Sequence, residues 1–187
     1  MAAPITGETW GDVIEPVREY LLRESEQPFS VLREKLQAAR AKLMAATDGL
    51  SDAQAEFRPG TGEGEDAWGI AEVLRHVGGV EPLMAERIIA LGEGRPTDNL
   101  TPTYAGYMEG VETRRLGELR GILATSLATL VRAIESVEGH ERLDTLDAHR
   151  RFGDLNCHGW IAMHTLHMED HARQIEKLRH LENFPAA

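Results

Sequence analysis

The last third of the chain carries the residues whose types and spacing are best suited to chemistry. Five of the eight histidines lie between residues 152 and 181, namely His158, His164, His167, His171 and His180. On a helix with 3.6 residues per turn, positions 164, 167 and 171 fall within about 60° of arc. Imidazoles four residues apart project in the same direction and can chelate one ion, so His167 and His171 are candidate metal ligands.

A third candidate ligand, His76, lies in another strongly apolar segment, between Leu74 and Val77. Unpaired imidazoles are costly in apolar surroundings, which favours a ligand role over simple packing. Facing helices of a bundle supply ligands to a shared core site. Three neutral histidines leave open positions on the ion, a pattern typical of catalytic rather than closed structural sites.

Two further residues near this candidate site have more than one interpretation. His164 lies one turn before His167 on the same face. There it either replaces one of the ligands or forms a hydrogen bond in the layer of residues behind them. Cys157 lies about two turns before His164. A buried cysteine that acts as a small hydrophobic residue is the simpler account, although the thiol is placed to approach the pocket.

Other classes of metal site do not match the sequence. A zincin requires H-E-x-x-H, and Met168 occupies the position of the glutamate. A ferritin-like di-iron site requires paired E-x-x-H motifs, which the predicted helices lack. Glu72 and Glu81 are interpreted as surface charges, although Glu72 lies one turn from His76 and can orient its ring.

Helical periodicity dominates the chain, and the alternation typical of strands is nearly absent. Ser51 and Gln54 form a capping-box pattern for one short turn, Asp66 is a predicted N-cap, and Thr101-Pro102 opens another helical segment. Residues 140–152 form a polar connection, longer than most helix–helix loops and a candidate lid or pocket wall. The predicted helices span residues 10–24, 28–46, 67–91 and 101–137, followed by the histidine helix within 152–181. We therefore predict an all-α bundle of four main helices with an extra N-terminal helix.

The length, net charge and cysteine content of the chain narrow the class of protein. The 187 residues fit a single domain, 1–187, with no repeat or second domain. A net charge of −11 argues against nucleic acid as a partner, and the basic segment 149–151 is explained by a solvated turn. The sequence has neither an apolar run long enough to span a membrane nor a secretory signal, and its one cysteine fits a reducing compartment. We expect a soluble, cytoplasmic protein that binds neither nucleic acid nor membrane.

Three motifs carry a resemblance to a known family. Trp68-Gly-Ile-Ala-Glu-Val-Leu-Arg-His76-Val places a tryptophan at the start of a helix and a histidine eight residues later. His167-Met-Glu-Asp-His171-Ala-Arg-Gln-Ile175 reads H-x-x-x-H-x-x-Q-I, and Leu50–Gln54 with Phe57-Arg-Pro59 is similar to a connector between the first two bundle helices. In this order and spacing the motifs resemble the DinB-like superfamily over roughly residues 28–181. That superfamily includes metal-dependent thiol S-transferases and the mycothiol-dependent maleylpyruvate isomerase.

The resemblance implies a fold and a site. It implies metal ligands at His76, His167 and His171 in a four-helix bundle with one long crossover connection, often dimeric, so we expect a homodimer. Residues 1–27 are an N-terminal extension of the minimal pattern. Imidazole ligands suit zinc, nickel, copper and iron alike, so the identity of the divalent ion stays open.

The resemblance also implies an activity, with alternatives. The leading hypothesis is a metal-dependent transferase in which the ion lowers the pKa of a low-molecular-weight thiol cosubstrate, so that a thiolate attacks a small electrophile. A hydrolase that activates water would use the same three ligands. A non-catalytic metal-binding or stress-response bundle, acting as a dimeric binding module, is the alternative from another class. A bundle with vestigial histidines is the third.

Overall fold

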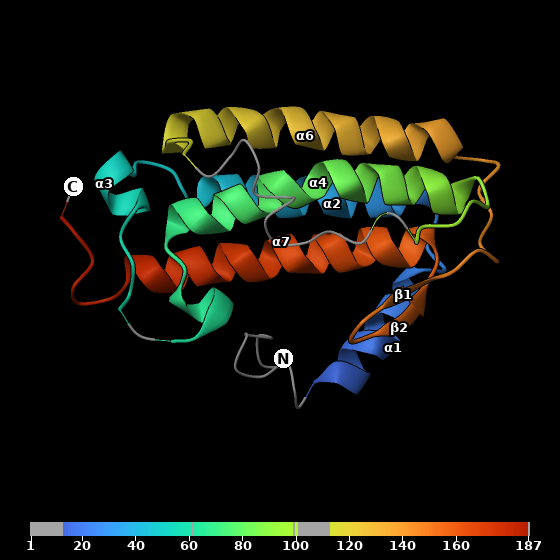
Figure 1. Cartoon of the computed structure of the whole chain (residues 1–187), viewed down its shortest axis with the longest axis horizontal. Coiled ribbons are helices and arrows are strands. Elements are labelled where there is room, and N and C mark those ends of the chain that lie inside the picture. The colour runs from blue at the N-terminus through green and yellow to red at the C-terminus, as the bar shows by residue number, and fades with distance from the viewer. Residues whose placement is uncertain (1–12, 61, 99, 101–112, 187) are drawn as a thin grey trace.

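The computed structural model describes residues 13–60, 62–98, 100 and 113–186, which are mostly helical. The four long helices α2, α4, α6 and α7 lie side by side, with α1 packed at one end (Figure 1). The predicted all-α bundle with an extra N-terminal helix is confirmed. The elements are α1 (Ile14–Glu24), α2 (Phe29–Ala45), α3 (Asp52–Ala55), the 3-10 helix η2 (Gly64–Ala67), α4 (Ile70–Gly92), α6 (Leu116–Val137), β1 (Asp147–His149), β2 (Gly153–Leu155) and α7 (Cys157–Arg179).

The chain direction reveals the long crossover. Helices α2 and α7 run from right to left in Figure 1, whereas α4 and α6 both run from left to right. Because α4 and α6 are parallel, the end of α4 at Gly92 and the start of α6 at Leu116 lie at opposite ends of the bundle. The predicted helix start at Thr101-Pro102 lies outside the described residues. The described helix begins at Leu116, where the Glu118 carboxylate accepts a hydrogen bond from the Arg115 backbone N–H at 3.2 Å.

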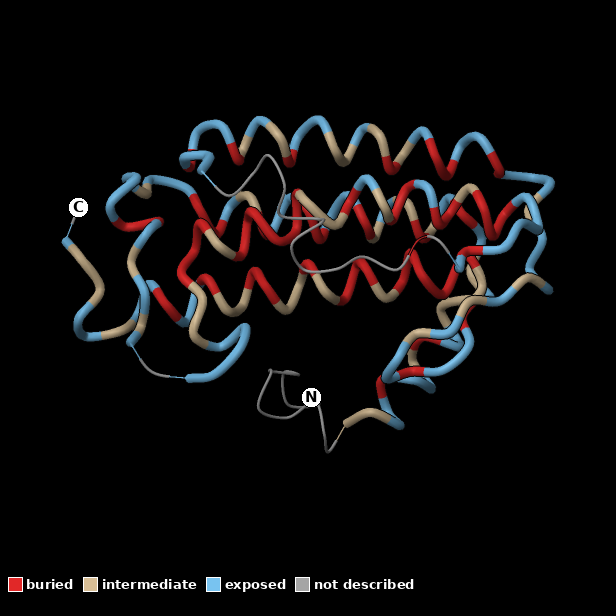
Figure 2. The backbone as a smooth tube through the Cα atoms, viewed as in Figure 1, coloured by how far each residue is buried: buried red, intermediate tan, exposed pale blue. Residues whose placement is uncertain are grey.

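The core lies where the apolar stripes of the long helices meet (Figure 2). On α2 the stripe recurs at three- and four-residue steps, as an amphipathic helix requires, and buries Leu32, Leu36, Ala39 and Leu43. Helices α4 and α7 are more enclosed than α2 and α6, and the buried residues of α7 include His164 and His171. Within the described ranges, none of the helices combines the length and the apolarity needed to cross a membrane.

The start of α4 differs from the prediction. The helix begins at Ile70 instead of Ala67, and Asp66 lies in η2. The Glu72 carboxylate caps α4 by accepting a hydrogen bond from the Gly69 backbone N–H at 2.9 Å. At Gly69 a Cβ atom would lie 2.4 Å from the carbonyl oxygen of Phe57, so any side chain here would force the backbone to shift. The predicted capping box at Ser51 and Gln54 is present in α3.

The predicted polar connection 140–152 and the residues after it form a short hairpin that the sequence does not indicate. Strands β1 and β2 pair in an antiparallel hairpin, with Asp147 opposite Leu155 and His149 opposite Gly153. Asp147 binds the Arg87 side chain at 2.7 Å, and its carbonyl oxygen accepts a hydrogen bond from the Trp160 indole N–H at 3.3 Å. These contacts to α4 and α7 hold the hairpin. Its strands are too short for an alternation pattern to reveal them.

Candidate metal centre

Helices α4 and α7 bring the three predicted histidines together. The Nε2 atom of His167 lies 2.9 Å from Nε2 of His76 and 2.9 Å from Nε2 of His171. One ligand atom from each of these histidines lies within 4.8 Å of the ligand atoms of the other two. In the described part of the chain, this is the one group of three or more histidine, cysteine or acidic side chains that could hold a metal ion. His76 and His171 are buried, whereas His167 is half-buried.

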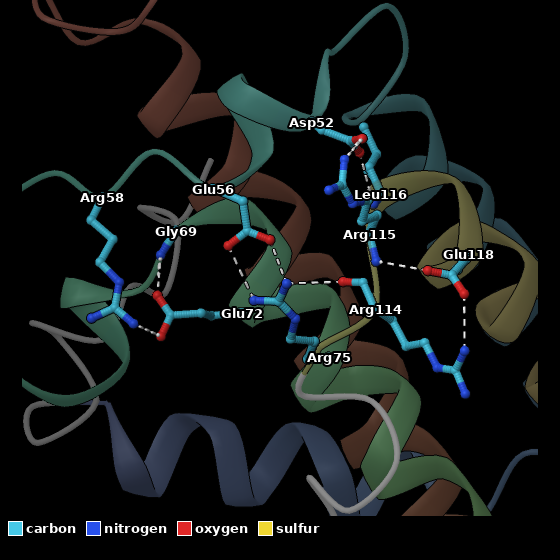
Figure 3. A network of polar contacts seen from close by, with 10 residues as sticks. All are labelled: Asp52, Glu56, Arg58, Gly69, Glu72, Arg75, Arg114, Arg115, Leu116 and Glu118. Atoms are coloured by element: carbon cyan, nitrogen blue, oxygen red, sulfur yellow. Dashed lines mark hydrogen bonds and ion pairs between the residues drawn. The ribbon is translucent and has the colours of Figure 1, made fainter.

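Residues at and just before the start of α4 pack around the cluster. Trp68 is half-buried and its ring centroid lies 5.0 Å from that of His76 and 6.3 Å from that of His171. Arg75, the residue before His76, donates to the Glu56 carboxylate and to the carbonyl oxygen of Arg114 at 2.9 Å (Figure 3). Because these contacts join the start of α4 to the segments before α4 and α6, they hold the helix end that carries His76.

Gln174 determines which nitrogen of His171 faces the cluster. Its amide Nε2 donates to the carbonyl oxygen of Glu65 at 2.6 Å, and its Oε1 lies 2.8 Å from Nδ1 of His171. A carbonyl oxygen only accepts, so the Glu65 contact fixes the orientation of the amide. The His171 Nδ1 must then donate its proton to Oε1, and a neutral His171 presents a lone pair at Nε2.

Hydrogen bonds among the three histidines cannot satisfy both short contacts. The His167 Nε2 atom carries either a proton or a lone pair. With a lone pair it faces the lone pair of His171 at 2.9 Å, and with a proton it can direct that proton at only one neighbour. One nitrogen pair therefore lacks a bridging proton in either case. A single cation would accept a lone pair from all three nitrogens, so this donor set fits a metal ion.

The environment keeps the three imidazoles in the form that binds metal. Burial, together with positive charge on His171 and His164, lowers the pKa of His76 to about 3. Burial also lowers the pKa of His171, and it lowers that of His167 well below the usual value, with added repulsion from His171 and His76. Metal ions bind neutral imidazole, so at neutral pH the cluster needs no deprotonation before it binds an ion.

His164 lies outside the group of three. Its Nε2 atom lies 3.0 Å from Oε1 of Glu81, and its ring centroid lies 5.8 Å from that of His167. His164 is therefore not one of the three candidate ligands, and its hydrogen bond goes to Glu81 rather than to one of them. The interpretation of Glu81 as a surface charge is wrong, because its side chain is 0% exposed and forms an ion pair with Arg40.

Glu72 and Cys157 are engaged elsewhere. The Glu72 carboxylate caps α4 and binds Arg58 at 2.6 Å, so it acts at the start of the helix. Cys157 is buried, and burial raises the pKa of its thiol to about 11. Its thiolate is therefore scarce at neutral pH, in agreement with its interpretation as a small hydrophobic residue.

The family follows from comparison with known proteins. The sequence model described as DinB superfamily matches residues 35–175, about three-quarters of the chain. The chain belongs to the DinB superfamily. The matched range contains His76, His167 and His171, and DinB membership together with this cluster fits a metal-binding protein. The comparisons with curated proteins and with solved structures return no match.

Proposed function

We propose that this DinB protein is a metal-dependent transferase that activates a low-molecular-weight thiol at an ion held by His76, His167 and His171. The observation that carries the proposal is the convergence of the Nε2 atoms of three neutral histidines, of which His167 is half-buried. Three protein ligands leave at least one coordination position for an outside ligand. Zinc, nickel and iron all suit such a donor set.

The charge balance of the site favours an anion as that outside ligand. The three imidazoles are neutral, and the nearby buried charges of Arg40 and Glu81 compensate each other. When bound, a divalent ion supplies uncompensated positive charge, which lowers the pKa of a thiol and favours its thiolate form. The thiol has to come from a cosubstrate, because the Cys157 thiol is buried and its pKa is raised to about 11.

The residues around the cluster have separate tasks in this proposal. Gln174 keeps the His171 lone pair directed at the ion, and the half-buried Trp68 ring forms an apolar wall beside His76 and His171. An apolar wall that excludes water favours transfer of the thiol to an electrophile over hydrolysis. The electrophile is a small molecule, and the proposal includes a cytoplasmic homodimer.

The first test is the metal content of untagged protein, measured by elemental mass spectrometry. We expect near-stoichiometric metal in the wild type, loss in His76→Ala and His167→Ala, and retention in the control His180→Ala, which removes an exposed histidine at the end of α7. Little metal in a folded wild type after reconstitution would contradict the proposal.

The second test is turnover of metal-loaded protein with a panel of low-molecular-weight thiols and electrophiles. We expect conjugation or isomerisation that His171→Ala abolishes. Stoichiometric metal without turnover in the whole panel would instead favour a non-catalytic binding module. Hydrolysis of a compound of the panel in the absence of any thiol would favour a hydrolase.

A further inference from the structure

A network of buried charged and polar side chains crosses the bundle beside the histidine cluster. Arg40 of α2 forms an ion pair with Glu81 of α4, and Ser126 of α6 donates to the second carboxylate oxygen. His164 of α7 binds the first oxygen of Glu81 through Nε2, at 3.0 Å. The side chains of Arg40, Glu81 and His164 are 4%, 0% and 1% exposed. The network therefore joins all four long helices away from solvent.

Stability alone does not account for such a network. Replacement of a buried ion pair by apolar side chains of similar volume is often neutral or stabilising, because removal of two charges from water is costly. The positions are also surrounded by apolar core: Leu36 and Leu43 flank Arg40 on α2, and Val77 and Met84 flank Glu81 on α4. Apolar residues at these positions would extend the helix stripes without interruption.

The network lies where it can set the geometry of the cluster. Helix α4 carries both His76 and Glu81, which lie about 7.5 Å apart along the helix axis. Helix α7 carries His164 about 4.5 Å before His167 along its axis. Since α4 and α7 are antiparallel, the Glu81–His164 contact joins the same two helices about one turn further along the bundle. The His164 ring also packs against the ring of His167, at 5.8 Å between centroids.

We propose that Glu81, held by Arg40 and Ser126, is a positioning residue for the metal centre. Through its hydrogen bond to His164 it fixes α7 against α4, so that His76 meets His167 and His171. A carboxylate only accepts hydrogen bonds, so His164 donates from Nε2 and its ring orientation is set by Glu81. The inference rests on the proposed metal site.

The test measures zinc affinity by competition with a chromophoric chelator, and the visible spectrum of cobalt-loaded protein. Residues behind metal ligands typically contribute about 10- to 100-fold to affinity, so we expect Glu81→Leu, which removes the acceptor of the His164 hydrogen bond, to raise the zinc Kd by about 10-fold and to alter the cobalt spectrum. The control Asp147→Asn breaks another arginine–carboxylate pair of α4, that with Arg87, and should leave both readouts unchanged.

Two further variants separate positioning from stability. Glu81→Leu leaves the buried Arg40 charge without its partner, so the double variant Arg40→Met/Glu81→Leu tests the same contact in a core without net charge. It should show the same loss of zinc affinity. In a double-mutant cycle, His164→Leu and Glu81→Leu should be non-additive in zinc Kd, since both remove the Glu81–His164 hydrogen bond.

The outcomes are distinct. Wild-type zinc affinity and an unchanged cobalt spectrum in both Glu81 variants, with lower stability only, would show a purely structural network and overturn the inference. Additive effects in the cycle would overturn the route through His164. A wild type that binds no zinc at the cluster would refute the proposed function itself, and the inference with it.

Discussion

The tautomer of His171 depends on one amide. Gln174 accepts from Nδ1 of His171 at 2.8 Å and donates to the Glu65 carbonyl oxygen at 2.6 Å. A ligand histidine commonly donates its second ring N–H to an acceptor that fixes its orientation, and Gln174 has this position. The amide thus links the cluster to the η2 segment that precedes α4.

Gln174→Leu should weaken metal binding without unfolding the protein. Leucine keeps the volume but lets the His171 ring adopt either tautomer, so we expect zinc Kd to rise about 10-fold. Chelator competition measures this, with Lys177→Leu, an exposed substitution on the same helix, as control. Equal affinities for the wild type and both variants would exclude a role for the amide.

Acid should destabilise the metal-free protein through its buried histidines. Burial lowers the pKa values of His76 and His164 to about 3, below the ordinary value of 6.5. The unfolded chain therefore binds more protons than the folded one between these values, and the free energy of unfolding falls as the pH drops below 6.5. Each such histidine contributes a slope of up to about 1.4 kcal/mol per pH unit.

Urea unfolding of metal-free protein between pH 7.5 and pH 5 measures this slope. His76→Ala removes one of the buried groups, so its stability should fall less steeply with acid than that of the wild type. His180→Ala should follow the wild type. Parallel curves for His76→Ala and the wild type would show that His76 is not held neutral by burial.

At the scale of the helices, the beginning of α4 is set by one close backbone approach. A Cβ atom at Gly69 would lie 2.4 Å from the Phe57 carbonyl oxygen, and backbone cannot yield as a flexible side chain can. Gly69→Ala should therefore shift the start of α4 together with the neighbouring Trp68. It should lower the free energy of unfolding by about 1–3 kcal/mol, as other overpacked substitutions do.

Gly121→Ala is the matched control for this prediction. Gly121 lies within α6, and a Cβ atom there would meet nothing within 4 Å. Alanine is the better helix former, so this variant should gain up to about 1 kcal/mol. Urea unfolding of the two variants should give opposite signs. A stabilised Gly69→Ala would contradict the assigned close approach.

The same elements show which features can be predicted from sequence. Periodicity places His76, His167 and His171 on the inner faces of two helices, and the family motifs connect them. A surface position does not fit Glu81, because it continues the apolar stripe of Val77 and Met84, where a charge indicates a buried partner. The hairpin could not be predicted, because contacts from Arg87 and Trp160 hold it rather than local pattern. Ring distances depend on helix register, which tertiary packing determines.

At the scale of the whole molecule, the cluster joins helices that are distant in sequence. His76 and His167 are 91 residues apart, so their nitrogens converge only when α4 and α7 are packed. An ion that binds all three histidines therefore binds the folded state and not the unfolded chain. By mass action it stabilises the fold by about 2.7 kcal/mol when its free concentration is 100 times Kd.

Thermal unfolding with increasing zinc should accordingly show a rising Tm in the wild type and in His180→Ala. The rise should be absent in His167→Ala, because that variant loses the nitrogen that both other rings approach at 2.9 Å. Removal of the ion with a chelator should return the wild-type Tm to its metal-free value. A rise of equal size in His167→Ala would place the bound zinc elsewhere on this acidic protein, whose net charge of −11 offers surface carboxylates to cations.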